Sequence, residues 1–308
     1  MKMPPALVLA VLAPVWGASF LFIRVLVTAG VEPVGVSAGR TVLGLATLLP
    51  FAFATRRSFR LRPWQWAALG VLGVTNFALP WTLFSIGQQY VPSGVGSIAN
   101  SAQPIWAAIF SAAMMRTDRL GPRRVAGLAL GFAGVLVLME GRVGQLDGEA
   151  WRGIPLMVLA TVLYAASAVS IRRWLADVPP LVLTVGQVAA ASVVLAPLAL
   201  GTGAYTGASF GWQEWASLLV LGGAGSGLAI VFYMWLLREV GAVAASAVTY
   251  LMPPIGIFLG WLLLDEPVKW PMLAGLALII AGVGLVQSIS LRRPARAAMA
   301  ATAPAGGD

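Results

Sequence analysis

Apolar stretches of about twenty residues alternate along this chain with short segments that hold most of its charged residues. An α-helix of about twenty residues crosses the hydrocarbon core of a bilayer. The pattern therefore predicts an all-α integral membrane fold with ten transmembrane helices. We expect these helices, to within about four residues at each end, at 5–27, 33–54, 64–86, 92–114, 122–140, 152–173, 179–201, 213–236, 242–264 and 270–289.

Basic residues fall mainly into alternate segments between these helices. Fifteen of the twenty Lys and Arg residues lie on one side of the predicted layer and three on the other, while Arg24 and Arg40 lie inside predicted helices. Because basic residues near helix ends are retained in the cytoplasm, both termini are predicted to be cytoplasmic. The net charge of +9 therefore indicates membrane orientation and a lipid environment, and no nucleic-acid partner, which would need one basic face.

Composition excludes a soluble domain and also limits which metal ions, covalent cross-links and cofactors the chain can hold. Only 10% of the 308 residues are charged and the mean hydropathy is +0.87, whereas soluble domains have roughly 25% charged residues. The chain has no Cys and no His, which are the usual ligands of transition metals. We therefore expect no metal site, no disulfide and no cofactor.

The chain repeats itself after 148 residues. Residues 126–135 and 274–283 are identical at eight of ten positions, and the same shift pairs Arg24 with Arg172. This predicts a five-helix repeat over 1–148, a second over 149–290, and a disordered basic tail over 291–308. Because five crossings are an odd number, the second repeat must be inverted in the membrane. Inverted repeats are a recurring design of carriers, although gene duplication without transport remains an alternative.

Several motifs resemble those of the EamA-type carriers of the drug/metabolite transporter superfamily, over about residues 5–289. The motifs are Pro33 with Arg40, the segment Pro104–Asp118 with Gly127–Val135, and the segment Pro253–Glu266 with Gly275–Val283. The resemblance implies a multi-pass transporter of the bacterial inner (cytoplasmic) membrane, with no enzymatic activity. Such carriers often export amino acids or related metabolites. Asp118 is a departure, because the family more often has Glu there.

Polar and aromatic residues recur at helical spacing inside several predicted helices. The candidates for binding a small-molecule substrate are Trp16, Ser19, Arg24, Arg40, Asn76, Ser97, Asn100, Tyr164, Ser167 and Thr249. Aromatic rings would hold an apolar group, and the polar side chains a carboxylate and an amine. Helix packing, an aromatic belt and snorkelling arginines are the alternatives. Pro104 and Pro253 are expected to kink their helices.

All eleven acidic residues lie outside the predicted helices or at their ends. No buried carboxylate is therefore available as a proton relay, which favours facilitated efflux. We expect a monomer or homodimer that exports amino acids or related small amphipathic metabolites by alternating access. The alternatives are a membrane-embedded enzyme acting on a lipid, for which only Asp265–Glu266 offers clustered acids, and a non-transporting membrane scaffold.

Overall fold

The computed structural model describes residues 4–54, 59–91, 93–115, 121–138, 148–255, 270 and 273–286. Within these ranges the chain is almost entirely helical and has no strand. The helices are α1 Pro5–Gly17, α2 Ser19–Thr28, α3 Pro33–Ala54, α4 Pro63–Gly73, η2 Val74–Ala78, α5 Leu79–Tyr90, α6 Ser93–Asn100, α7 Gln103–Met114, α8 Pro122–Leu138, α9 Ala150–Trp174, α10 Pro180–Gly201, α11 Trp212–Leu219, η4 Val220–Leu228, α12 Ala229–Val240, α13 Ala242–Ser246 and η5 Ala247–Leu251. A further helix covers Leu273–Val286. The predicted all-α class is confirmed for these residues.

Proline marks the start of many of these helices. Its missing N–H costs nothing in the first turn, where the backbone donors have no partner inside the helix. Helices α1, α3, α4, α8 and α10 begin with Pro5, Pro33, Pro63, Pro122 and Pro180. The prolines seen in the sequence therefore mark where these helices begin.

Six helical segments of the described residues are long and apolar enough to cross a membrane. They are Pro5–Thr28, Pro33–Ala54, Pro63–Tyr90, Trp151–Trp174, Pro180–Gly201 and Trp212–Val240. The fourth predicted span is divided into α6 and α7 by a turn at Ser101–Ala102, with Pro104 in the first turn of α7. The structure describes the ninth predicted span as far as Ile255. This part begins as the α-helix α13, continues as the 3-10 helix η5, and returns to α-helix just before Pro253.

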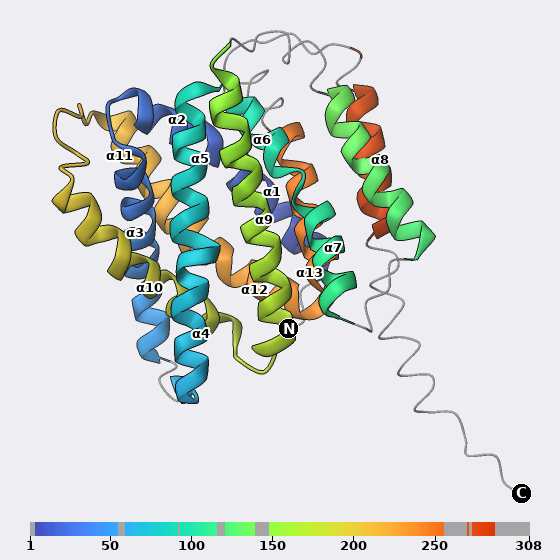
Figure 1. Cartoon of the computed structure of the whole chain (residues 1–308), viewed down its shortest axis with the longest axis horizontal. Coiled ribbons are helices and arrows are strands. Elements are labelled where there is room, and N and C mark those ends of the chain that lie inside the picture. The colour runs from blue at the N-terminus through green and yellow to red at the C-terminus, as the bar shows by residue number, and fades with distance from the viewer. Residues whose placement is uncertain are drawn as a thin grey trace, which may run out of the picture.

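The long helices run side by side in one bundle (Figure 1). Helix α3 packs against α10 and η4, and α5 packs against α9. Helix α8 lies beside Leu273–Val286 at one edge of the bundle, and glycines bring the two backbones together. A Cβ atom on Gly282 would lie 2.5 Å from the amide nitrogen of Gly131. Only a residue without a side chain fits this contact.

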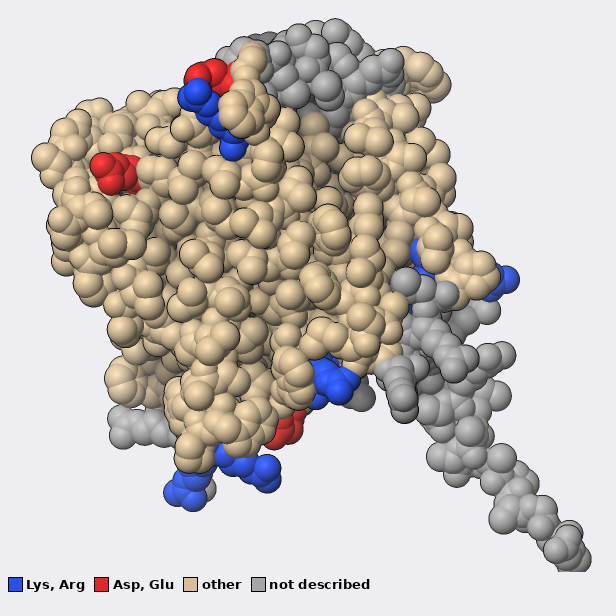
Figure 2. Space-filling view, in the orientation of Figure 1, with Lys and Arg blue, Asp and Glu red and all other residues tan. Residues whose placement is uncertain are grey.

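The surface has the division expected of a membrane protein. Figure 2 shows charged residues mainly near the two ends of the helices, with a broad uncharged band between them. Seven tryptophans of the described residues are exposed and lie near helix ends, where aromatic rings favour the membrane interface. They are Trp64, Trp66, Trp151, Trp174, Trp212, Trp215 and Trp270.

Some predicted features lie outside the described residues. They are Asp118, the acidic pair Asp265–Glu266, the last part of the ninth span, and the basic tail 291–308.

Candidate functional site

Two π-helical segments interrupt long helices in the middle of the bundle. Segment η2 lies within Pro63–Tyr90 and η4 within Trp212–Val240. A shift of 148 residues moves η2 onto residues 222–226, inside η4. A π-helical turn rearranges the backbone hydrogen bonds and often occurs at functional sites. Both segments contribute to the site described below.

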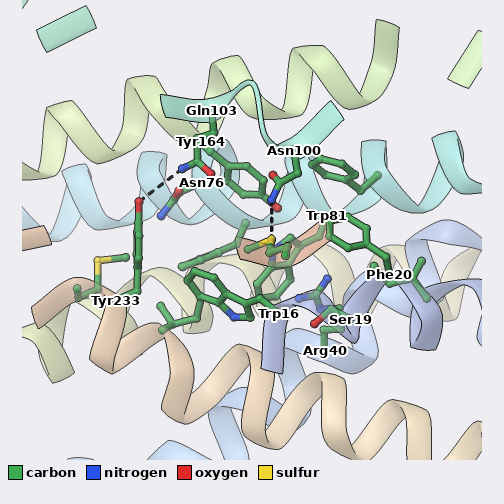
Figure 3. Close-up of a pocket in the computed structure, with 16 residues that line it drawn as sticks. Trp16, Ser19, Phe20, Arg40, Asn76, Trp81, Asn100, Gln103, Tyr164 and Tyr233 are labelled. Carbon is green, nitrogen blue, oxygen red and sulfur yellow. Dashed lines mark hydrogen bonds between the residues drawn. The ribbon is translucent and has the colours of Figure 1, made fainter. Parts of the chain in front are cut away.

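A cavity with an empty volume of about 670 Å³, its open part included, lies where these segments meet the neighbouring helices. The lining residues are Trp16, Ser19, Phe20, Ile23, Arg40, Asn76, Phe77, Trp81, Phe84, Asn100, Gln103, Tyr164, Ile230, Tyr233, Met234 and Met252. Figure 3 shows Arg40 and Ser19 on one side of the cavity, with Asn76 and Gln103 on the far side.

Arg40 brings a positive charge into the bundle. Its side chain is only 6% exposed. The Nε atom donates to the Ser226 hydroxyl at 3.1 Å, and the guanidinium carbon lies 4.1 Å from the ring centroid of Trp81. The Ser226 hydroxyl itself donates to the Leu221 carbonyl at 2.7 Å. Arg40 is thus held by a hydroxyl and an aromatic face, neither of which neutralises its charge.

Three amide side chains line the cavity. Asn76 donates through Nδ2 to Oε1 of Gln187 at 3.0 Å, so that η2 is tied to α10. Asn100 donates through Nδ2 to the sulfur of Met252 at 3.1 Å, and its buried Oδ1 has no hydrogen-bond partner. Gln103 donates to the Tyr233 hydroxyl at 3.4 Å. A buried acceptor without a partner is costly, so a water molecule or a neutral donor group of a solute that bonds Oδ1 of Asn100 would remove this cost.

Aromatic rings form much of the remaining wall. The rings of Trp16 and Tyr233 lie 5.2 Å apart, and those of Phe84 and Tyr164 lie 6.0 Å apart in a stacked arrangement. Trp16 is fixed by a hydrogen bond from Nε1 to the carbonyl of Gly225 in η4, at 2.9 Å. Such rings offer a large apolar surface with little loss of conformational freedom.

The structure brings six of the ten candidate residues to one cavity and leaves four outside it. Trp16, Ser19, Arg40, Asn76, Asn100 and Tyr164 line the cavity. Ser97 is buried without lining it. Ser167 contacts the Thr75 hydroxyl, Thr249 donates to the carbonyl of Ser246, and Arg24 donates to the carbonyl of Gln88.

Other lining residues were not among the sequence candidates. The most informative are Trp81, Gln103 and Tyr233. Trp81 contacts the guanidinium of Arg40. Tyr233 accepts a hydrogen bond from Gln103 and packs against the ring of Trp16. A signal existed for Gln103, because an amide next to Pro104 inside an apolar segment needs a polar partner. No comparable signal marked Trp81 or Tyr233, since aromatic residues also occur on lipid-facing surfaces.

The lining side chains are suited to binding rather than to catalysis. The described residues that line the cavity include no carboxylate, and the described part of the chain holds no cluster of acidic residues that could bind a metal ion. One guanidinium, three amides and several aromatic rings can together hold a small solute with an apolar body and an anionic group.

Comparison with known proteins identifies related sequences along almost the whole chain. A family model described as the EamA-like transporter family matches residues 4–140 and again residues 151–288. The uncharacterised transporter YvbV of Bacillus subtilis is 28% identical, over 96% of this chain and 95% of that protein. The uncharacterised inner membrane transporter YedA of Escherichia coli K12 is 29% identical, over 88% of this chain and 87% of that protein.

A solved crystal structure has a similar fold. It covers 92% of this chain and 98% of its own chain, with a TM-score of 0.67. The two sequences are 22% identical, so this likeness concerns the fold alone.

Proposed function

The chain belongs to the EamA-like transporter family, and we propose that it exports amino acids or related small amphipathic metabolites by alternating access. It is a multi-pass transporter of the inner membrane, and its relatives are named as transporters rather than enzymes. The observation that carries the proposal is the cavity, in which guanidinium, amide and aromatic groups meet inside a bundle with an apolar surface. A scaffold without transport has no need of such a cavity.

The proposed architecture is ten transmembrane helices in two inverted repeats, 1–148 and 149–290, with both termini in the cytoplasm. The internal sequence repeat supports this arrangement, and so does the double match of the family model. The equivalent positions of η2 and η4 are a third argument. Inverted repeats can expose a central site to each side in turn by rocking one half against the other.

Two equivalent arginines provide contacts that could alternate during such a cycle. Arg24 donates to the carbonyl of Gln88, near the end of α5, at 2.5 Å. Arg172 donates to the carbonyls of Leu237 and Arg238, near the end of α12, at 3.0 Å each. The 148-residue shift moves Arg24 onto Arg172 and Gln88 to within one residue of Leu237. A cation at a helix C-terminus is stabilised by the free carbonyls, and in the proposed topology the two contacts lie on opposite sides of the membrane.

Breaking one of these contacts is expected to open the cavity toward one side only. The chain has no Cys, so Ser19→Cys introduces a single thiol at the cavity wall. Arg172→Gln should increase labelling of this thiol by a membrane-impermeant maleimide from the cytoplasmic side, and Arg24→Gln from the outer side. Labelling rates in inside-out and right-side-out vesicles measure the two effects.

Arg60→Gln is the matched control, because Arg60 is exposed in the segment before α4 and remote in sequence from both contacts. It should leave both labelling rates unchanged. If Arg24→Gln and Arg172→Gln increased labelling from the same side, the two contacts would not be alternating gates.

Export itself can be tested in proteoliposomes. The probe is a mixture of proteinogenic amino acids with their deaminated and 2-hydroxy analogues, loaded inside. We expect efflux to fall by roughly tenfold or more in Trp16→Ala and in Asn100→Ala, because each removes a contact from the cavity. Trp66→Ala, at an exposed tryptophan, should retain wild-type efflux. Unchanged efflux in both cavity variants would remove this cavity as the transport site.

A further inference from the structure

Building on the proposed function, we infer that the transported solute is a monoanion, a carboxylate on an apolar or aromatic body without an ammonium group. The inference rests on the buried Arg40 guanidinium, which faces a cavity whose described lining residues carry no negative charge. The inference favours deaminated carboxylic acids as substrates and excludes the zwitterionic amino acids, which the broader proposal also includes.

Arg40 keeps most of its hydrogen-bonding capacity for a ligand. A guanidinium carries five N–H donors in a planar fork. Among the described residues only the Nε donor has a partner, the hydroxyl of Ser226. The two terminal nitrogens can therefore bind both oxygens of one carboxylate, the bidentate geometry that arginine favours. The face of Trp81 holds the guanidinium plane from one side.

Charge balance decides against a zwitterion. The acidic residues of the described chain are Glu32, Glu149, Asp177, Glu214 and Glu239, and none of them lines the cavity. A bound carboxylate forms a neutral pair with Arg40, whereas a zwitterion leaves the site with an uncompensated positive charge. An uncompensated charge away from water is strongly unfavourable.

The geometry of an α-amino acid increases this cost. Its ammonium group is bonded to the carbon next to the carboxylate, so binding the carboxylate at Arg40 brings two positive charges together. The amide groups of Asn76 and Gln103 lie on the far side of the cavity from Arg40 (Figure 3). Those amides are better placed to contact the distant end of the solute. Rings such as Trp16 and Tyr233 also line the cavity and provide the surface for an apolar body.

A monoanionic solute also gives export a driving force. All acids of the sequence lie outside the predicted spans or at their ends, so the spans have no deep carboxylate to couple protons. Outward movement of a monoanion is favoured by an inside-negative membrane potential. At about 100 mV the potential favours the outside concentration by roughly fifty-fold. The inference therefore links substrate charge to the direction of transport.

Two matched ligand series test the charge of the solute with the wild-type protein. The first contains 3-phenylpropanoate, phenylalanine and 2-phenylethylamine, and the second contains 4-methylpentanoate, leucine and isopentylamine. A ligand that binds the folded state raises its melting temperature by an amount that increases with the ratio of ligand concentration to dissociation constant. We expect one or both acids to bind at least about tenfold more tightly than the matching amino acid, and the amines not to bind.

The outcomes separate this inference from the function on which it rests. Equal or tighter binding of phenylalanine or leucine would overturn the monoanion while leaving amino-acid export intact. If neither acid bound, the inference would also fail, and efflux of other solutes would decide the broader proposal. Binding of an acid without any efflux from proteoliposomes would keep the ligand class and reject transport. A valinomycin-imposed, inside-negative potential should accelerate efflux of the bound acid, and no acceleration would contradict the monoanion.

Discussion

Replacing Arg40 with Met is expected to abolish transport while leaving the folded protein at least as stable as the wild type. The guanidinium is buried without a counter-charge among the described residues, and Ser226 keeps its hydrogen bond to Leu221 after the change. Replacing a buried charged group by an apolar one of similar volume is often neutral or stabilising, by about 1–4 kcal/mol. Loss of a buried charged contact to the solute costs about 2–5 kcal/mol. The initial rate of efflux and the melting temperature measure the two effects.

Two further variants show which property of Arg40 matters. Arg40→Lys keeps the charge but loses the planar fork and the stacking on Trp81, so it should transport at an intermediate rate. Arg60→Met removes an exposed arginine and should transport normally. A large fall in the melting temperature of Arg40→Met would instead assign Arg40 to the fold, and wild-type efflux would exclude it from the site.

The helices of this chain could be predicted from its sequence because hydropathy is a local property. A lipid-facing surface tolerates little charge, so apolar runs and the prolines between them already indicate where helices begin and end. The breaks inside spans were harder to predict. Pro104 indicated a disturbance near α7, and the four glycines of η4 weaken a regular helix there. Neither these glycines nor the residues of η2 specify that the disturbance is a π-helical turn.

The cavity could be predicted in part. Arg40, Asn76 and Asn100 are too polar for hydrocarbon, so desolvation favours their burial inside the bundle. For Arg40 snorkelling to the interface was the alternative, and the structure shows a buried side chain instead. Hydroxyl groups give a weaker signal, because they can bond a backbone carbonyl of the preceding turn, as Thr249 does with Ser246. Which aromatic residues turn inward depends on how neighbouring helices are rotated, and the sequence of one helix does not contain that information. Trp81 and Tyr233 therefore emerged only from the structure.

The close backbone contact between α8 and Leu273–Val286 yields the second large effect, which concerns stability. We expect Gly282→Ala to lower the melting temperature clearly, because its new Cβ would lie 2.5 Å from the Gly131 nitrogen and 2.7 Å from the Gly127 carbonyl oxygen. These neighbours are backbone atoms of α8, so the whole helix must move. Overpacking of this kind typically costs about 1–3 kcal/mol. Thermal unfolding of the purified variant in detergent measures the change.

Gly284→Ala is a matched control on the same helix. A Cβ atom on Gly284 would have no neighbour within 4 Å, and alanine favours a helix over glycine by up to about 1 kcal/mol. The two substitutions are chemically identical and two residues apart, yet we expect opposite signs: destabilisation at Gly282 and no loss, or a small gain, at Gly284. Equal effects would mean that α8 and Leu273–Val286 are not held by backbone contact at Gly282. A difference would assign the repeated glycines to the pairing of these two helices rather than to the cavity.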